Sequence, residues 1–146
     1  MTGTEVQRCR RSYGFVDYVF HIRRRVSESG APNRVGEWKL GSAETIASYF
    51  SENAVYQNIP MEPIVGRSEI LNFLEGFIST FGGIEFIIHN QVADGARVCN
   101  ERTDRFHLGD KHVVLPVMGI FEITDSKIVA WRDYFDLAPI NQLLAG

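Results

Sequence analysis

The hydrophobic pattern of this chain changes its period once, and the change limits the folds that the chain can adopt. Between residues 68 and 81, apolar side chains recur at helical spacing, at Ile70, Leu71, Leu74, Phe77, Ile78 and Phe81. From residue 84 onward, apolar and polar residues alternate with the period of two that is typical of half-buried strands. A helical segment followed by consecutive strands predicts an α+β domain, in which helices cover one face of a curved sheet.

Glycine, aspartate and serine residues mark the expected ends of these elements. Strands are expected at about 84–92, 96–107, 112–124 and 127–137, joined by turns of hairpin length. Ser68 is expected to cap the long helix, and Gly82-Gly83 to end it. The earlier part of the chain predicts an amphipathic helix at about 12–27, a helix that Ser42 caps and that carries Tyr49 and Phe50, and a strand at 54–58.

Length, charge and cysteine content exclude several classes of protein. The 146 residues suit one domain, and no apolar run reaches the roughly 20 residues of a membrane helix. Residues 1–39 hold eight basic and four acidic side chains, but no zinc-ligand spacing or aromatic-interleaved repeat that would indicate nucleic-acid binding. Because the chain shows no signal-peptide pattern and only Cys9 and Cys99, we expect a cytoplasmic protein without disulfides, nucleic-acid partner or membrane contact.

Charged side chains fall on the same strand faces as large apolar ones. Residues two apart share a face, so Arg102 lies beside Asp104, and Asp133 lies beside Val129 and Trp131. If both faces point inward, an apolar interior encloses two carboxylates, and Arg102 is expected to hold both because lone buried charges are costly. Two such neighbouring acids lose their protons at different pH values, so that one can give a proton while the other takes one. Cross-strand salt bridges on a solvent face are the alternative that the alternation leaves open.

Three short blocks carry a more specific signal. They are Tyr56-Gln57-Asn58-Ile59-Pro60-Met61, Glu101-Arg102-Thr103-Asp104 and Trp131-Arg132-Asp133-Tyr134-Phe135-Asp136. In order and spacing they resemble the motif blocks of the limonene-1,2-epoxide hydrolase family. The resemblance covers residues 43–137 and implies a cone-shaped fold of the nuclear-transport-factor-2-like type, with helices on a strongly curved mixed sheet around an apolar pocket. It also implies a homodimer.

The resemblance implies one-step hydrolysis of an epoxide by water, without an ester on the enzyme. By position, Asp133 would be the base that deprotonates the water, and Tyr56 and Asn58 would help to hold that water. Asp104 would be the acid that protonates the epoxide oxygen, and Arg102 would bridge the two carboxylates. The reaction needs a proton donor and an activated water on opposite sides of the ring, and these residues supply both.

The expected partners are a small hydrophobic epoxide, cyclic or terpene-like, and water, with no cofactor and no metal. His107 and His112 flank a turn, but two imidazoles without a third ligand make a poor metal site. Apolar residues that share the inward faces are the candidate pocket wall: Phe106, Leu115, Val117, Trp131, Phe135, Ile84, Phe86 and Ile88. Ordinary core packing is the alternative for these positions.

Two other functions stay open at this point. Related cone-shaped folds host isomerases, dehydratases and cyclases, in which Asp133 would remove a proton from carbon, and a non-catalytic small-molecule-binding module is also possible. Arg102 between two acids, with Asn58 beside Tyr56, favours a site that holds water over one that holds an enolate. The sequence thus predicts one domain at 1–146, with a divergent helical segment at 1–41 and a motif-bearing core at 42–137.

Overall fold

The computed structural model describes residues 36–39 and 42–146, so the helix expected at 12–27 lies outside the described residues. A seven-stranded mixed sheet has the order β1-β4-β5-β6-β7-β2-β3. Its strands are β1 (Gly36–Lys39), β2 (Phe50–Asn58), β3 (Ile64–Val65), β4 (Glu85–Asp94), β5 (Arg97–Leu108), β6 (Lys111–Thr124) and β7 (Lys127–Tyr134). The pairing of β2 with β7 is parallel, and every other pairing among these strands is antiparallel.

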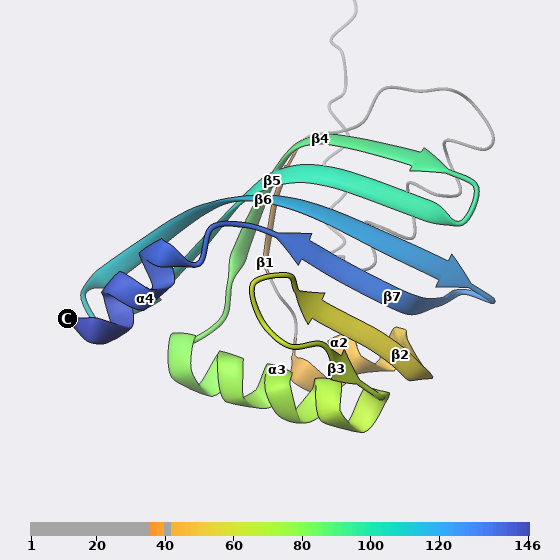
Figure 1. Ribbon diagram of the computed structural model, residues 1–146, viewed down its shortest axis with the longest axis horizontal. Helices are drawn as coiled ribbons and strands as arrows, with labels where there is room; N and C mark the ends of the chain where they lie inside the picture. Colours follow the sequence, from red (N-terminus) through yellow and green to blue (C-terminus); the bar gives the residue numbers. More distant parts are fainter. Residues whose placement is uncertain (1–35, 40–41) are drawn as a thin grey trace, which may run out of the picture.

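Three helices accompany this sheet in the described part of the chain: α2 (Ala43–Ser48), α3 (Arg67–Phe81) and α4 (Ala138–Ala145). The long strands bend strongly along their length, and α2 and α3 lie together beneath the concave side of the sheet (Figure 1). Helix α4 returns after β7 and packs against β6. The α+β prediction, with helices over a curved mixed sheet, is confirmed. Within the described residues, none of the helices has the length and apolar character needed to cross a membrane.

The first helix ends earlier than its apolar pattern predicts. Ser42 caps α2 as expected, because its side chain accepts a hydrogen bond from the backbone N–H of Thr45 at 3.2 Å. Tyr49, however, forms the turn after the helix, and Phe50 begins β2, four residues before the predicted strand. Phe50 is 1% exposed and stacks on Trp131 with ring centroids 6.0 Å apart. This long-range packing outweighs the local helical pattern.

The long helix begins one residue before its predicted cap. Gly66, with φ +96°, occupies the N-cap position, and Ser68 lies within the first turn of α3. The predicted end is confirmed: Gly82 adopts the left-handed conformation at φ +69°, and its N–H donates to Ile78 O at 2.8 Å. Further along, β7 ends at Tyr134, before the end of the strand predicted at 127–137. The helix α4 that follows it was not predicted.

Two register shifts change which residues face the helices. In β4, an extra residue between Ile88 and Asn90 brings Gln91 opposite Asn100, and Gln91 is buried. In β7, Ile128 pairs with Ile123 and Ala130 with Glu122, so one extra residue stands between them. Bulges of this kind exchange the two faces of a strand. The prediction that Val129 faces inward is therefore wrong: Ile128 is fully buried and Val129 only half-buried.

Candidate active site

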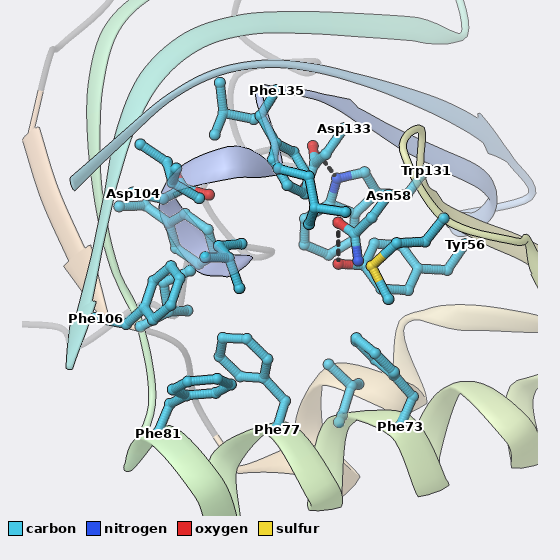
Figure 2. A pocket seen from close by; sticks show the side chains of 18 of the residues that line it. Tyr56, Asn58, Phe73, Phe77, Phe81, Asp104, Phe106, Trp131, Asp133 and Phe135 are labelled. Carbon is cyan, nitrogen blue, oxygen red and sulfur yellow. Dashed lines mark hydrogen bonds between the residues drawn. The ribbon is translucent and has the colours of Figure 1, made fainter. Parts of the chain in front are cut away.

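A cavity of about 300 Å³ is lined by residues of the sheet and of helices α3 and α4. Three phenylalanines of α3, namely Phe73, Phe77 and Phe81, project from the helix toward the strand residues (Figure 2). Polar groups reach the same cavity from β2, β5 and β7, through Tyr56, Asn58, Asp104 and Asp133. The space therefore combines a largely apolar wall with a few polar groups gathered on one side, which is the usual character of a small-molecule site.

Most of the residues predicted for the pocket wall line this cavity. They are Ile84, Phe86, Phe106, Leu115, Val117, Trp131 and Phe135. Ile88 does not: it is 1% exposed and packs in the main core with Phe50, Ile70 and Val98. Its position on β4 next to the bulge directs it into that core, so its assignment to the pocket is corrected.

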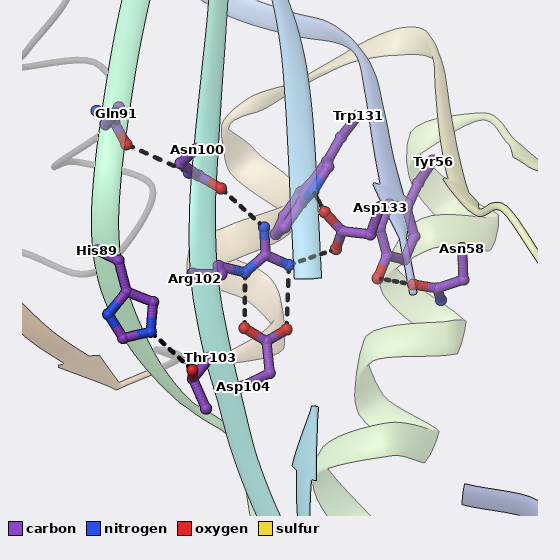
Figure 3. A network of polar contacts seen from close by, with 10 residues as sticks. All are labelled: Tyr56, Asn58, His89, Gln91, Asn100, Arg102, Thr103, Asp104, Trp131 and Asp133. Carbon is purple, nitrogen blue, oxygen red and sulfur yellow. Dashed lines mark hydrogen bonds and ion pairs between the residues drawn. The ribbon is translucent and has the colours of Figure 1, made fainter. Parts of the chain in front are cut away.

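Arg102 joins the two carboxylates of the site (Figure 3). Its Nε donates to Asp104 Oδ1 at 2.7 Å, and its Nη2 donates to Asp104 Oδ2 at 3.1 Å and to Asp133 Oδ2 at 2.7 Å. All three side chains are buried, with residue exposures of 1%, 5% and 4% for Arg102, Asp104 and Asp133. The salt bridges lie on the inner face of the sheet, and Phe86 packs against the guanidinium with its ring centroid 5.0 Å from Cζ.

Asp133 accepts a second hydrogen bond, from a residue to which the motif blocks gave no such role. The indole Nε1–H of Trp131 donates to Asp133 Oδ1 at 2.8 Å, so each carboxylate oxygen accepts one hydrogen bond from the protein. Trp131 was predicted only as part of the pocket wall. A signal existed in the sequence, because residues two apart on a strand share a face and an indole N–H needs a partner when it is buried.

Tyr56 and Asn58 lie beside Asp133 because β2 pairs in parallel with β7 and brings Asn58 opposite Asp133. The Tyr56 hydroxyl donates to Asn58 Oδ1 at 3.2 Å, and the Tyr56 ring packs on Trp131 with centroids 5.1 Å apart. Burial, followed by the negative charge of Asp133, raises the pKa of Tyr56 far above its usual value. The phenol therefore remains protonated, and its oxygen retains the capacity to accept a hydrogen bond.

The environment of Asp104 favours its neutral form. Burial raises the pKa of Asp104 to about 6, although Arg102 acts in the opposite direction through its charge and its hydrogen bonds. For Arg102, burial alone would lower the pKa, but the charges of Asp133 and Asp104 outweigh it and raise the pKa. Arg102 thus remains a cation between the acids, and Asp104 is able to carry a proton at mildly acidic pH.

One row of residues across the sheet runs through this centre. Gln91, Asn100, Gly119, Asp133 and Asn58 are successive partners across β4, β5, β6, β7 and β2. Sequence reasoning did not select the first three. Asn100 lies two residues from Arg102 on the same strand face, so alternation could have identified it. Gln91 reaches this face only because of the bulge in β4. The phenylalanines of α3 were also missed as cavity residues, although their four-residue spacing places them on one helix face.

Metal-ligating side chains do not gather in the described ranges. Across 36–39 and 42–146, no three histidine, cysteine or acidic side chains are placed so that they would hold one ion. His107 and His112 pair across β5 and β6 with ring centroids 5.9 Å apart, on the exposed side of their strands. They lie outside the cavity that holds the two carboxylates.

The catalytic domain of limonene-1,2-epoxide hydrolase, as a family model, matches residues 40–145, which is most of the chain. The chain belongs to this family. Epoxide hydrolase EphG of Mycobacterium tuberculosis is 36% identical over 97 residues, covering 64% of this chain and 62% of that protein. The match thus spans less than two thirds of this relative's length.

Solved structures place the family member in the expected fold. An LEH-like epoxide hydrolase of M. tuberculosis is 35% identical and superposes with a TM-score of 0.62, covering 71% of this chain and 78% of that chain. A putative SnoaL-like polyketide cyclase of Shewanella putrefaciens CN-32 superposes with a TM-score of 0.63 at 16% identity, covering 70% and 75% of the two chains. At that identity the second likeness shows the fold alone.

Proposed function

We propose that the protein is an epoxide hydrolase that adds water to a hydrophobic, cyclic or terpene-like epoxide and releases a vicinal diol, without a covalent intermediate. The observation that carries this proposal is the ion-pair centre: Arg102 bridges two carboxylates that are both buried and both face one apolar cavity. Family membership supports the same activity, as does the likeness to two epoxide hydrolases of M. tuberculosis.

On the water side, Asp133 is the proposed general base. Its two oxygens accept hydrogen bonds from Arg102 and Trp131, which fixes the plane of the carboxylate. A water that donates one hydrogen to Asp133 and the other to the Tyr56–Asn58 pair would present its lone pair to the cavity. Such fixed placement of a nucleophile supplies a large part of the acceleration expected from an enclosed site.

On the oxygen side, Asp104 is the proposed general acid. Its raised pKa allows it to hold a proton, and its position on the cavity wall gives it access to an epoxide oxygen. In the reaction, water oxygen bonds to a ring carbon while the carbon–oxygen bond of the epoxide breaks. Asp133 takes a proton from water and Asp104 gives one to the departing oxygen, so a proton must pass from Asp133 to Asp104 before the next turnover.

The cavity favours apolar substrates of modest size. Two aromatic rings of α3 pack against Phe106 of β5. The ring centroids of Phe77 and Phe81 lie 5.7 and 5.1 Å from that of Phe106. Charged groups other than the ion-pair centre are absent from the wall that the described residues form. A compact cyclic epoxide would bury its hydrocarbon part against these rings and direct its oxygen to Asp104.

The test is to offer the purified protein a panel of cyclic and terpene epoxides and to analyse the products for vicinal diols. A single turnover in ¹⁸O-labelled water is expected to place the label in the diol, because water attacks directly. Label in a protein carboxylate would contradict direct attack. Absence of any diol across the panel, with isomerised or dehydrated products from ketosteroids or polyketides, would instead favour Asp133 as a base toward carbon.

The family resemblance also predicts a homodimer. The length of the chain favours a single domain over 1–146, and its low cysteine content favours the cytoplasm. Light scattering of the purified chain measures the assembly, and a mass near 33 kDa is expected because one chain has a mass of 16.5 kDa. A concentration-independent mass of one chain would contradict the dimer.

A further inference from the structure

A chain of buried amides extends from Arg102 away from the substrate cavity. Arg102 Nη1 donates to Asn100 Oδ1 at 3.0 Å, and Asn100 Nδ2 donates to Gln91 Oε1 at 3.2 Å (Figure 3). Asn100 and Gln91 are each 1% exposed, and neither lines the cavity. The two amides therefore contact neither substrate nor water in the proposed reaction, and their direct partner within the active site is the guanidinium.

The direction of this chain is imposed by Arg102. A guanidinium has only donors, so the oxygen of Asn100 must face Nη1 and its NH₂ group must face Gln91. The oxygen of Gln91 must then face Asn100, which leaves the Gln91 Nε2 group buried and without a hydrogen-bond partner among the described residues. Reversing either amide would place two N–H groups against each other. A buried unpaired donor is costly, and this orientation keeps that cost at the end of the chain farthest from the active site.

Gly119 leaves the space that the guanidinium occupies. It pairs with Asn100 on one side and Asp133 on the other, and Arg102 lies over it. A Cβ atom at this position would overlap Arg102 Nη1 and would lie 2.7 Å from Asp133 Oδ1 and 3.0 Å from Asn100 Oδ1. All three atoms belong to the ion-pair centre or to the amide chain, so any side chain here would displace that centre.

We propose that Gln91, Asn100 and Gly119 are positioning residues that fix the rotation of the Arg102 guanidinium, so that its Nη2 bridges Asp104 and Asp133. This role rests on the proposed function. Asn100 holds Nη1, Gln91 fixes the orientation of Asn100, and Gly119 leaves room for the planar group on the inner face of β6. With Nη1 engaged by a neutral acceptor, Nε and Nη2 are directed to the carboxylates.

The proposal has a consequence for proton donation by Asp104. The charged and titratable groups around Asp104 are Arg102 on its own strand, Asp133 on β7 and Tyr56 on β2, while the cavity residues of α3 and α4 do not titrate. Arg102 lowers the pKa of Asp104 through its charge and hydrogen bonds. A guanidinium that rotates more freely lowers it less, so the alkaline limb of the activity profile would move to higher pH.

Gln91→Met and Asn100→Leu test the amide chain, with Asn90→Leu as the matched control. Asn90 is the neighbour of Gln91 on β4, but it is exposed and donates to Glu101. The first readout is the ¹⁵N spectrum of the Arg102 guanidinium in the full chain, in which restricted rotation gives separate Nη1 and Nη2 signals. We expect exchange between them to be at least about 10-fold faster in both test variants, because a hydrogen bond to a charged group is lost or loosened.

The second readout is the pH dependence of kcat for diol formation. Both test variants are expected to lose about 10-fold or more in kcat and to show an alkaline limb at higher pH, while Asn90→Leu matches the wild type. Gln91→Glu keeps an oxygen acceptor for Asn100 and is expected to restore slow guanidinium exchange. A merely structural role would lower stability in the test variants without changing the exchange rate or moving the limb.

Gly119→Ala gives a separate test, with Gly76→Ala as its control. We expect Gly119→Ala to lose at least about 100-fold in kcat because the guanidinium is displaced. Nothing lies within 4 Å of an added Cβ at Gly76, so its variant should retain full activity.

Unchanged guanidinium exchange in folded Gln91→Met or Asn100→Leu would overturn the proposal. If the wild type forms no diol, the proposed function fails, but the exchange measurement still decides the positioning role.

Discussion

Asp104 and Asp133 share the same cation but differ in their other contacts. Asp133 accepts from the Trp131 indole as well as from Arg102, and faces Asn58 across the parallel strand pair. Within the described part of the chain, Asp104 accepts hydrogen bonds from Arg102 alone, through Nε and Nη2, and its pKa is raised. Two carboxyl groups with different surroundings are suited to opposite roles in proton transfer.

The role of Asp133 is tested by Asp133→Asn. The amide retains the size of the side chain but cannot accept a proton from water, so we expect kcat for diol formation to fall by about 10²- to 10⁴-fold. Steady-state kinetics with the epoxide that gives the highest rate measures this loss. Asp110→Asn, which changes an exposed acid in the turn between β5 and β6, is the control and should retain wild-type rates. Full activity of Asp133→Asn would disprove the base assignment.

The pH dependence tests the acid. Asp104 must be protonated to donate, and its pKa is raised to about 6, so activity is expected to decline as pH rises through that region. The measured value belongs to the pair of acids, because the two titrations interact. The measurement is kcat/KM of the wild type and of Asp104→Asn between pH 5 and pH 9. An Asp104→Asn variant that is as active as the wild type over the whole range would be incompatible with an acid role.

At the level of elements, α3 supplies one wall of the cavity. Phe73, Phe77 and Phe81 follow each other at four-residue intervals, with ring centroids 6.3 and 4.8 Å apart. Beside this row of rings, Ile70 and Leu74 are buried and belong to the main core. Correct placement of the aromatic rings therefore depends on where the helix begins and ends.

Two glycines of this region have opposite expected effects on stability. Gly82 adopts φ +69°, so Gly82→Ala should lower the free energy of unfolding by about 1–2 kcal/mol because L-residues are strained there. Gly76 lies within α3 with open space around it, so Gly76→Ala should raise the free energy of unfolding by about 0.5–1 kcal/mol. Urea unfolding of both variants measures the effects. Equal effects with the same sign would contradict the assigned conformations.

Over the whole molecule, the ion-pair centre depends on strands far apart in the sequence. Asn58 of β2 and Asp133 of β7 meet through the parallel pairing, and Arg102 of β5 reaches Asp133 across β6 because Gly119 has no side chain. Helix α4 closes the other end, where Leu143 is buried with Phe106 and neighbouring residues of β6. The site is therefore a property of the assembled sheet.

Placing Asp104 in this interior also affects the stability of the whole fold. Burial raises the pKa of its carboxyl group to about 6 in the folded protein, from 3.8 for an unperturbed aspartate. Between these values the folded state binds more protons than the unfolded state, so this group's contribution to the free energy of unfolding falls as pH rises from about 4 to 6. Urea unfolding should show that the wild type loses stability relative to Asp104→Asn over this window, and a constant difference would refute the raised pKa.

Alternation along β5 and β6 was sufficient to predict the inner faces of these strands. Their ladder runs without a register shift from Arg97 opposite Glu122 to Leu108 opposite Lys111. An unbroken period of two preserves the side on which each residue lies, which is why Arg102 and Asp104 were identified. The sides on which Val129 and Gln91 lie depend on bulges in β7 and β4, and a single extra residue reverses the alternation without a distinctive local pattern.

Sequence alone determined the class of fold, the main helix and its end, and the residues of the polar centre, because these depend on local periodicity, local backbone preferences and the quoted motif blocks. The tertiary structure decided which apolar residues form the cavity and which form the core, as with Ile88, and it placed α4 against β6. It also decided the direction of the amide chain behind Arg102. These features arise from contacts between distant segments, and the free energy of such contacts is not encoded in any one stretch of the chain.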